Sequence, residues 1–412
     1  MTCSKKCKGL VVPRVRRTIS HQEPIDLDSI DPCVCVIGVG FVGEALLREF
    51  GQAFTSIGFD ILRRRIEELE KVFSPFPKVT LTTDETRLRE ATHYLISVPT
   101  PLKKDRSINP AYLISAIRTT LSYARPGSAI ILESSVSVGS TRQFLYPYKD
   151  TYHCGMSPER VDPGRTVPSP ASIPKLVSAL TPKSLSLIQK LYSQVFTTVI
   201  PVSSPETAEL TKLFENCHRM INIAYVNEMA DAARVHGVDP EEMVAAASSK
   251  PYGFTTYKPG LGVGGTCIPV NPFYLFANSA RLPVLQEATS QMRKRPGRKA
   301  RVFYQRVKKM IGGKLPRVLV VGIGYKVGQG GLACSPGLEF AEMLRRMGCL
   351  ELMYYDPLVE KGAVEWMEAL DDEEWEVKHL EGGFDAIAIC MRQKGVDFGV
   401  LEKSKIIVQE VG

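Results

Sequence analysis

The sequence predicts an α/β protein in which two doubly wound parallel-sheet domains are joined by a long central helix. Short apolar runs alternate with amphipathic stretches in both halves of the chain, and a segment between the halves keeps helical spacing over about 30 residues. Continuous apolar runs followed by helices are typical of buried parallel strands with helical crossovers. The length of 412 residues suits two or three domains.

The N-terminal segment is strongly basic. Six Lys and Arg residues precede Glu23, the first acidic residue, so this segment supplies +6 of the net charge of +8. Residues 1–30 show no apolar periodicity, and we expect a disordered basic tail. Because only +2 remains for the rest of the chain, we expect no nucleic-acid partner.

The first domain is expected over residues 31–203, where apolar runs precede amphipathic stretches. The runs are CVCVIGVG (33–40), TSIGFDI (55–61), THYLISVPT (92–100) and SAIILESS (128–135).

Glycines follow the first of these runs at a spacing that suits a dinucleotide. Gly38, Gly40 and Gly43 form a G-x-G-x-x-G pattern between an expected strand and helix, and Asp60 ends the next run. Such glycines let a pyrophosphate approach a helix N-terminus, and the acid accepts hydrogen bonds from the adenine ribose. The pattern predicts a Rossmann-like domain that binds NAD, although the arginines at 63–65 weaken the preference over NADP.

A long helix is expected in the segment 204–237, which has neither Pro nor Gly in its interior. Glu209, Lys212, Asn216 and Arg219 fall on one stripe of this helix. The stripe is either a solvated face or the lining of a cleft. In a cleft, a desolvated Lys212 can lose its proton near neutral pH and shuttle protons during alcohol oxidation.

The strand pattern returns after a central helical and dimerisation domain expected over 204–310. RVLVVGIGY (317–325) and LELMYYDPLV (350–359) predict a second, smaller Rossmann-like domain over 311–412.

Cys267 directly follows the glycine-rich segment GLGVGGT (260–266). Glycines allow backbone to approach a ligand, so this cysteine is either a nucleophile facing that ligand or a buried structural residue beside a flexible turn. A thiol nucleophile suits a dehydrogenase that oxidises an alcohol beyond the aldehyde. The hemithioacetal loses a second hydride, and water then releases an acid from the thioester.

The ten cysteines include no CxxC pair and no Cys/His cluster at zinc spacing, so we expect no metal and reduced thiols. We find neither an apolar stretch long enough for a membrane span nor a signal-peptide core, and expect a cytoplasmic protein without a membrane partner.

These segments together resemble the UDP-glucose/GDP-mannose dehydrogenase family, from about Cys33 to the C-terminus. SPERVDPG and PGLGVGGTCIPVNPFYL look most like the branch that acts on UDP-N-acetylhexosamines. The other segments that carry the resemblance are GVGFVG, SVPTPL, ESSVSVGST, AELTKLFENCHRMINIAYVNE, GIGYK and YYDP.

The resemblance implies roles for individual residues. Cys267 matches the nucleophile, Lys212 the catalytic lysine, Asn216 an asparagine that positions the lysine and oxyanion, and Glu159 a general acid/base. Asn271 stands where a residue handles the attacking water. The matching NAD contacts are Gly38, Gly40, Phe41, Val42, Gly43, Asp60, Arg65, Thr100 and Ser135. The matching UDP-sugar contacts are Arg160, Val161, Arg219, Gly264, Tyr325 and Lys326. The loop glycines would then make room for sugar and nicotinamide at the thiol.

The chain departs from the family pattern at charged positions. Asn271 replaces an Asp, and Thr266 replaces a His. Ala333 replaces an Arg, and Gly330 and Gly331 shortly before it replace two acids. Gln409-Glu410-Val411, before Gly412, replaces a segment that resembles Asp-Gly-Arg. An amide orients water but cannot accept its proton, which slows hydrolysis by about 10²–10⁴-fold.

The leading hypothesis is NAD-dependent four-electron oxidation of the C6 alcohol of a UDP-sugar, either UDP-N-acetylhexosamine or UDP-glucose, to the uronic acid by a homodimer or higher homo-oligomer. The alternative is a non-catalytic member that binds nucleotide and acts as an oligomer partner or regulator. A two-electron hydroxyacid-type dehydrogenase using Lys212 alone would leave Cys267 unexplained.

Overall fold

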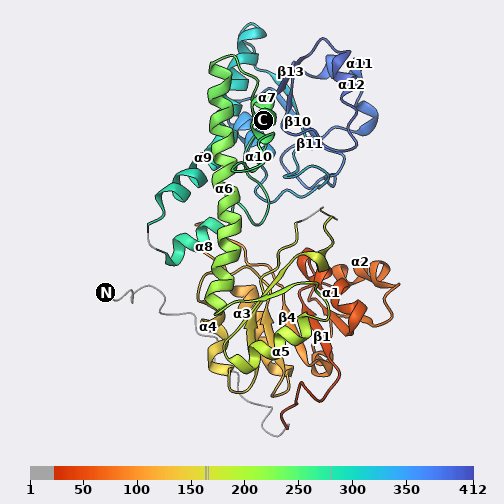
Figure 1. Ribbon diagram of the computed structural model, residues 1–412. Helices are drawn as coiled ribbons and strands as arrows, with labels where there is room; N and C mark the ends of the chain where they lie inside the picture. The colour runs from red at the N-terminus through yellow and green to blue at the C-terminus, as the bar shows by residue number, and fades with distance from the viewer. Residues whose placement is uncertain (1–22, 163–164, 166, 280) are drawn as a thin grey trace. The chain divides into compact units, whose positions relative to one another are not determined.

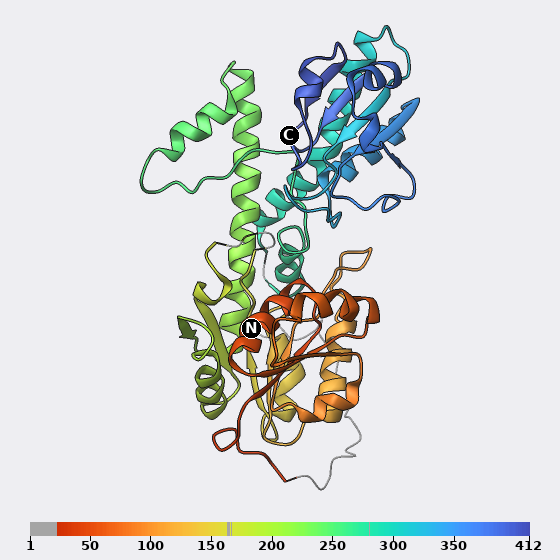
Figure 2. The same ribbon diagram turned by 90° about the vertical axis from the view of Figure 1, so that its right-hand side faces the viewer.

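The computed structural model describes residues 23–162, 165, 167–279 and 281–412. The chain divides into two compact units, Met1–Phe214 with Phe273–Ser279, and Glu215–Pro272 with Ala280–Gly412. Helix α6 (Pro205–Val235) begins in the first unit and continues into the second as one uninterrupted helix of 31 residues (Figures 1 and 2). The predicted long helix is thereby confirmed.

The first unit is built on an eight-stranded sheet of order β3-β2-β1-β4-β5-β6-β7-β8. Neighbouring strands run parallel except β6 and β7, which pair antiparallel. Because the strand order reverses between β1 and β4, the carboxyl ends of these two strands flank the crevice where such sheets bind ligands. The strands are β1 (Cys33–Ile37), β2 (Thr55–Phe59), β3 (Val79–Thr82), β4 (His93–Ile96), β5 (Ala129–Leu132), β6 (His153–Met156), β7 (Lys175–Ala179) and β8 (Val199–Pro201).

Helices cover both faces of this sheet. They are α1 (Phe41–Ala53), α2 (Arg63–Phe73), α3 (Ala111–Tyr123), α4 (Ser140–Leu145) and α5 (Pro182–Tyr192), with the short η1 (Glu85–Glu90), η2 (Tyr146–Tyr148) and η3 (Pro170–Ser172). In β1, Val34 and Val36 pack with α1, α2 and α5, whereas Cys35 and Ile37 pack with α3 and α4. This alternation explains why the strands read as continuous apolar runs.

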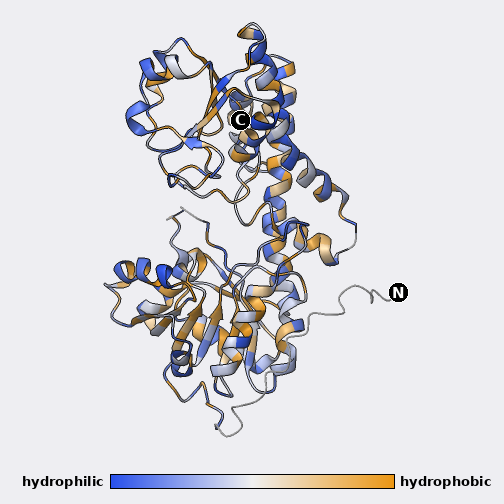
Figure 3. Cartoon of the chain, turned by 180° about the vertical axis from the view of Figure 1, so that it is seen from behind, coloured by the Kyte–Doolittle hydropathy of each residue, from blue (hydrophilic) through white to orange (hydrophobic). Residues whose placement is uncertain are grey.

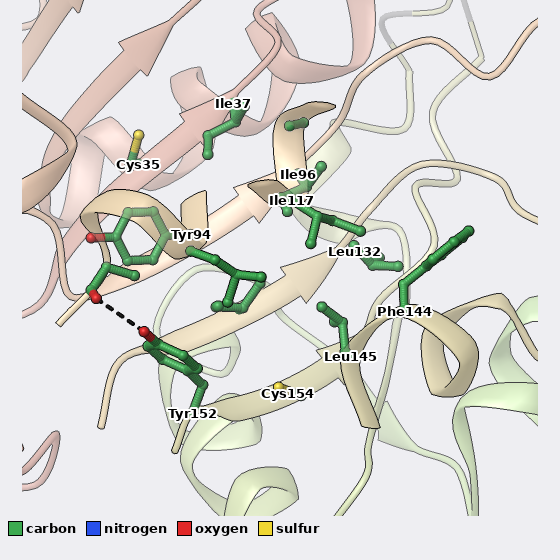
Figure 4. Close-up of a cluster of buried hydrophobic side chains, with 14 of the residues drawn as sticks. Cys35, Ile37, Tyr94, Ile96, Ile117, Leu132, Phe144, Leu145, Tyr152 and Cys154 are labelled. Atoms are coloured by element: carbon green, nitrogen blue, oxygen red, sulfur yellow. Dashed lines mark hydrogen bonds between the residues drawn. The ribbon is translucent and has the colours of Figure 1, made fainter. Parts of the chain in front are cut away.

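Figure 4 shows the core on the α3 side, where Ile117 of α3 and Phe144 and Leu145 of α4 gather around the central strands. The hydroxyl of Tyr152 donates to the carbonyl of Ala124 (3.2 Å) at the edge of this core, so its polar atom is paired. In Figure 3 the strands of the first sheet are largely apolar.

The second unit contains a five-stranded sheet, all parallel, of order β11-β10-β9-β12-β13. Its order reverses between β9 and β12, as in the first sheet. The strands are β9 (Arg317–Val321), β10 (Glu351–Tyr355), β11 (Glu368–Ala369), β12 (Ala386–Ile389) and β13 (Ile407–Glu410). The described part of the chain thus has the predicted fold class.

Two separate cores lie on the faces of the second sheet. Val318 and Val320 pack with α9 and α10, while Leu319 and Val321 pack with α11 and α12. The helices are α7 (Pro240–Ser248), α9 (Pro283–Met310), α10 (Pro336–Met347), α11 (Val377–Gly383) and α12 (Gly399–Glu402), with η4 (Asp372–Glu374). Helix α8 (Asn271–Asn278) starts in the second unit and continues in the first.

The predicted basic tail falls largely on residues 1–22, which lie outside the described residues. Described residues that follow it are in contact with the first unit. Ile25 donates its backbone N–H to the Pro126 carbonyl (2.8 Å), Leu27 is buried, and Asp28 pairs with Lys190 (2.6 Å). Among the described residues, no helix is both long and apolar enough to cross a membrane.

Candidate active site

The turn between β1 and α1 has the geometry that the glycine motif predicts. Gly38 has φ +84°, and a Cβ there would lie 2.9 Å from the side chain of Val98. A Cβ on Gly43 would overlap the carbonyl oxygen of Gly38. At both positions a larger residue is therefore excluded by neighbouring atoms of the protein, without any ligand being bound.

Gly40 differs from these two glycines because a Cβ there would meet nothing within 4 Å. It is the N-cap of α1, where no side chain caps the helix, and Phe41 beside it is half exposed. Open space at an uncapped helix N-terminus is what an incoming pyrophosphate requires. These residues fit NAD.

Asp60 lies at the carboxyl end of β2, as expected. One carboxylate oxygen accepts the backbone N–H of Val39 (3.1 Å) and the other accepts that of Leu62 (3.0 Å). These bonds orient the carboxylate beside the glycine turn and leave further lone pairs for ribose hydroxyls.

The arginines at 63–65 are all paired with glutamates. Arg65 donates to the carbonyl of Val39 (2.8 Å) and to Glu44 (2.7 Å). Arg63 and Arg64 form exposed pairs with the glutamates four residues later on α2. Arg63 and Arg64 therefore belong to ion pairs on the surface of α2, and their presence does not favour NADP over NAD.

Thr100 and Ser135 meet beyond the carboxyl ends of β4 and β5. The Thr100 hydroxyl donates to the Ser135 carbonyl (2.8 Å), and the Tyr274 hydroxyl donates to the Thr100 carbonyl. The structure therefore brings these two predicted cofactor residues together at the edge of the sheet that carries the glycine turn.

Glu159 is nine-tenths buried and belongs to an ion cluster that the sequence analysis missed. Its carboxylate accepts the backbone N–H groups of Arg160 (2.6 Å) and Val161 (2.8 Å) and pairs with Lys175 (2.7 Å). Burial acts to raise the pKa of Glu159, but Lys175 and these donors outweigh it, and the pKa is lowered. Glu159 is therefore ionised at neutral pH and can accept a proton.

Lys212 lies in the first-unit part of α6 and is nine-tenths buried. Three residues earlier, Glu209 is buried and accepts the backbone N–H groups of Gly139 (2.5 Å) and Thr141 (2.7 Å). Burial raises the pKa of Glu209 to about 7. The predicted polar stripe is thus buried at these two residues rather than solvated.

In the second unit, predicted catalytic residues are connected by one chain of hydrogen bonds. Arg219 donates to the side-chain oxygen of Asn216, and the Asn216 amide donates to that of Asn271. The backbone N–H of Asn271 donates to the carbonyl of Cys267 (2.9 Å). Cys267 is half-buried and keeps a free thiol, so it is not a sealed core cysteine.

Two of the glycines before Cys267 lie against the side chain of Tyr325. A Cβ on Gly264 would lie 2.7 Å from the Cβ of Tyr325, and Gly265, at φ +93°, would place one 3.0 Å from the Tyr325 ring. Gly265 also donates its N–H to the carbonyl of Ala333 (2.8 Å). These two glycines make room for Tyr325, while Gly260 has open space around it.

Comparison with known proteins identifies the family of the chain. Residues 33–196 match the model for the "UDP-glucose/GDP-mannose dehydrogenase family, NAD binding domain", and residues 206–295 match that for the family's central domain. UDP-N-acetyl-D-glucosamine 6-dehydrogenase of Pseudomonas aeruginosa is 32% identical over 323 residues, which cover 71% of this chain and 75% of that protein. The chain belongs to the UDP-glucose/GDP-mannose dehydrogenase family.

Other relatives agree with this membership. UDP-N-acetyl-D-mannosamine dehydrogenase of Methanocaldococcus jannaschii is 28% identical over 323 residues, covering 73% of this chain and 74% of that protein. Among solved structures, the UDP-D-ManNAc dehydrogenase from Pyrococcus horikoshii aligns with a TM-score of 0.81 and 26% identity over 91% of this chain and 94% of its own. The first unit therefore carries the NAD-binding domain of a nucleotide-sugar dehydrogenase family.

Two of the departures from the family pattern, Gly330 and Val411, lie in tightly packed surroundings. A Cβ on Gly330 would overlap the Leu358 carbonyl oxygen, so an acid cannot stand there in this backbone. Val411 is buried in the core between the second sheet and α9, whereas Glu410 pairs with Arg392 (2.6 Å). The remaining predicted substrate residue, Lys326, follows Tyr325 in the loop after β9, and its backbone forms an isolated antiparallel bridge with Gln329. In the described residues, no group of three or more His, Cys, Asp or Glu could hold a metal.

Sequence reasoning missed Lys175 and its partner Glu133. One signal was available: Lys175 opens the run KLVSA, whose other residues are apolar or small. A lysine in a buried strand requires an ionic partner, but the partner is 42 residues away in the sequence, at the end of an apolar run.

Proposed function

We propose that this protein oxidises the C6 alcohol of a UDP-sugar to the uronic acid with two NAD per sugar. The observation that carries the proposal is the hydrogen-bonded chain that connects the half-buried Cys267 thiol loop to Asn271, Asn216 and Arg219. The proposed domains assign the cofactor to residues 31–203, the lysine and thiol to 204–310, and the nucleotide sugar to 311–412.

The first step is oxidation of the alcohol to the aldehyde. Bound NAD would supply the hydride acceptor for C6 and would be held by the glycine turn at Gly40 and by Asp60. Lys212, which is nine-tenths buried, accepts the hydroxyl proton on its side-chain nitrogen. Asn216 lies one turn further along α6 and orients the lysine and the developing oxyanion.

The second step requires the thiol. Cys267 adds to the aldehyde carbon to form a hemithioacetal, and loss of a second hydride leaves a thioester on the sulfur. Water then cleaves the C–S bond, which returns the thiol and releases the carboxylate. Each turnover consumes one water and releases three protons and two reduced cofactors.

The residues around the hydrolysis step set its rate. Asn271 orients water but cannot take its proton, since it carries an amide whose oxygen already accepts from Asn216. Glu159 is the other carboxylate proposed for this step, but its two oxygens already accept hydrogen bonds from Lys175 and from the backbone N–H groups of Arg160 and Val161. We expect hydrolysis to be the slow step.

The substrate is a UDP-N-acetylhexosamine or UDP-glucose. The similarity to UDP-N-acetylhexosamine dehydrogenases supports the first of these. The residues proposed to hold the nucleotide sugar are Arg160, Val161, Arg219, Gly264, Tyr325 and Lys326.

A pre-steady-state count of NADH with a panel of UDP-sugars, with mass spectrometry of Cys267, tests the proposal. Turnover at two NADH per sugar is the expected result, and Cys267→Ser should form no acid. Acid formation by that variant would overturn the thioester mechanism. A burst of two NADH per site with an acyl mass on Cys267 would show that hydrolysis has stopped.

A second candidate is a non-catalytic member that binds nucleotide and partners an active relative. The observation that favours it is the uncharged group at Asn271, together with Val411 packed into the core where the family pattern has a charged residue. NAD or UDP-sugar binding without NADH from any sugar is the result that this candidate predicts.

A further inference from the structure

A buried ion cluster lies at the centre of the first unit. Lys175, 2% exposed, places its ammonium 2.7 Å from Glu133 and 2.7 Å from Glu159. The Tyr192 hydroxyl donates to the second oxygen of Glu133, and the ring of Phe196 lies beneath the ammonium at 5.6 Å. With both carboxylates ionised, the cluster carries a net charge of one negative unit.

Such a cluster is a poor source of stability. Desolvating three charges costs several kcal/mol per ion, and apolar residues of similar volume often replace a buried ion pair without loss. The role of the cluster therefore lies in the neighbouring groups that its side chains hold in place.

The cluster holds the turn that follows β6. One oxygen of Glu159 accepts a hydrogen bond from Lys175, and the other accepts the backbone N–H groups of Arg160 and Val161. The Arg160 guanidinium donates in turn to the carbonyl of Pro174 (2.7 Å), the residue before Lys175. The 159–161 turn is thus anchored at two points to the start of β7.

The pKa values of the two carboxylates are shifted in opposite directions. Burial raises the pKa of Glu133 to about 7, whereas Lys175 and the two backbone donors outweigh burial at Glu159 and lower its pKa. Near neutral pH a proton taken up by the cluster resides on Glu133. Glu159 stays ionised and keeps both N–H groups of the turn.

We propose that Lys175 is a positioning residue: it holds the Glu159 carboxylate, and through it the 159–161 turn, in the arrangement that binds the nucleotide sugar. This inference rests on the proposed function, which places the 159–161 turn against the substrate. Lys175 itself is enclosed by its partners and does not act on the substrate.

The variant that tests this is Lys175→Met/Glu133→Gln. It removes the ammonium of Lys175 together with the carboxylate of Glu133, so Glu133 is not left as a buried carboxylate without its partner. Lys175→Arg keeps the cation. Lys190→Met, which removes a lysine from an exposed pair with Asp28, is the control.

For the double variant we expect at least a tenfold rise in KM for the UDP-sugar, with KM for NAD within twofold of the wild type. Lys175→Arg should stay within threefold for both. A double variant with the wild-type KM for the sugar, or with equal rises for sugar and NAD, would overturn the proposal because a general loss of structure does not discriminate between substrates.

Hydrogen exchange separates this inference from the proposed function. In the double variant the amides of Arg160 and Val161 should exchange at least tenfold faster, while that of Val177 in β7 stays protected. If the wild type makes no NADH with any sugar, the proposed function fails and this measurement alone decides. Unchanged exchange at the two amides would then overturn the positioning role.

Discussion

Asn271 is the residue whose chemistry most directly limits the proposed reaction. Its side chain is buried, and its backbone is hydrogen-bonded to Cys267. Asn271→Asp is expected to speed thioester hydrolysis by about 10²–10⁴-fold, because a carboxylate takes a proton from water and an amide does not. The measurement is the decay of the acyl mass on Cys267 after a single turnover.

The control is Asn278→Asp, the same change at the last residue of α8, where an exposed amide donates to the carbonyl of Val138. It should leave the decay unchanged. Equal decay rates in the wild type and Asn271→Asp would show that another group, with Glu159 the first candidate, already supplies the base.

Glu209 makes stability depend on pH in a defined direction. Burial raises its pKa from 4.5 to about 7, so the folded state binds a proton that the unfolded state has lost. The resulting stabilisation is complete below about pH 4.5 and disappears as the pH rises through about 7. Glu209→Gln should therefore show a smaller fall in the thermal unfolding midpoint between pH 5 and 8 than the wild type does.

Glu206, one turn earlier on α6, is the matched control. Its hydrogen bond to Arg142 lowers its pKa, so it is ionised in both states across this range. Glu206→Gln should leave the difference between pH 5 and pH 8 as it is in the wild type. A Glu209→Gln slope equal to that of the wild type would contradict a raised pKa at Glu209.

At the scale of elements, the β1–α1 turn separates what glycine does for the fold from what it does for the ligand. Gly43→Ala would overlap the Gly38 carbonyl oxygen, so we expect a lower thermal midpoint. Gly40→Ala meets open space at φ −65° and should leave the midpoint within about 2 °C. It should nevertheless raise the Kd for NAD at least tenfold, because the methyl group occupies the space of the pyrophosphate.

Calorimetry of both variants and titration with NAD provide the measurements. A Gly40→Ala protein that binds NAD as the wild type does would mean that the pyrophosphate does not approach this turn.

Elements that are specified by residues close together in the sequence were predictable from it. The run CVCVI alternates between two helical layers, so both of its faces are apolar and the strand is recognisable without knowledge of its partners. The glycine turn and Asp60 form one strand–helix–strand unit. The absence of Pro and Gly from the interior of α6 likewise predicted its full length.

Features that depend on distant partners were not predictable. Lys175 pairs with residues 42 and 16 positions away, and no periodicity marks these pairs. Gly264 and Gly265 are needed because Tyr325, about 60 residues later, packs against them. The glycines stand out in the sequence, but the side chain that packs against them does not.

At the scale of the whole molecule, α6 carries several of the residues proposed to act in the reaction. Lys212 lies in the first unit and Asn216 in the second, four residues apart on one face of a continuous helix. The same helix also exposes large apolar side chains: Leu210, Phe214, Tyr225 and Met229 are 47%, 68%, 59% and 37% exposed.

Exposed apolar side chains four residues apart on a helix mark an interaction surface, and we propose that a second copy of the chain covers this one. Tyr225→Lys/Met229→Lys should lower the molar mass measured by light scattering from a multiple of the chain mass toward that of one chain. Glu70→Lys, a charge change at an exposed position of α2, should not. A wild-type protein that scatters as a single chain at micromolar concentration would contradict the homo-oligomer, while an unchanged mass in the double variant would place the interface on another element.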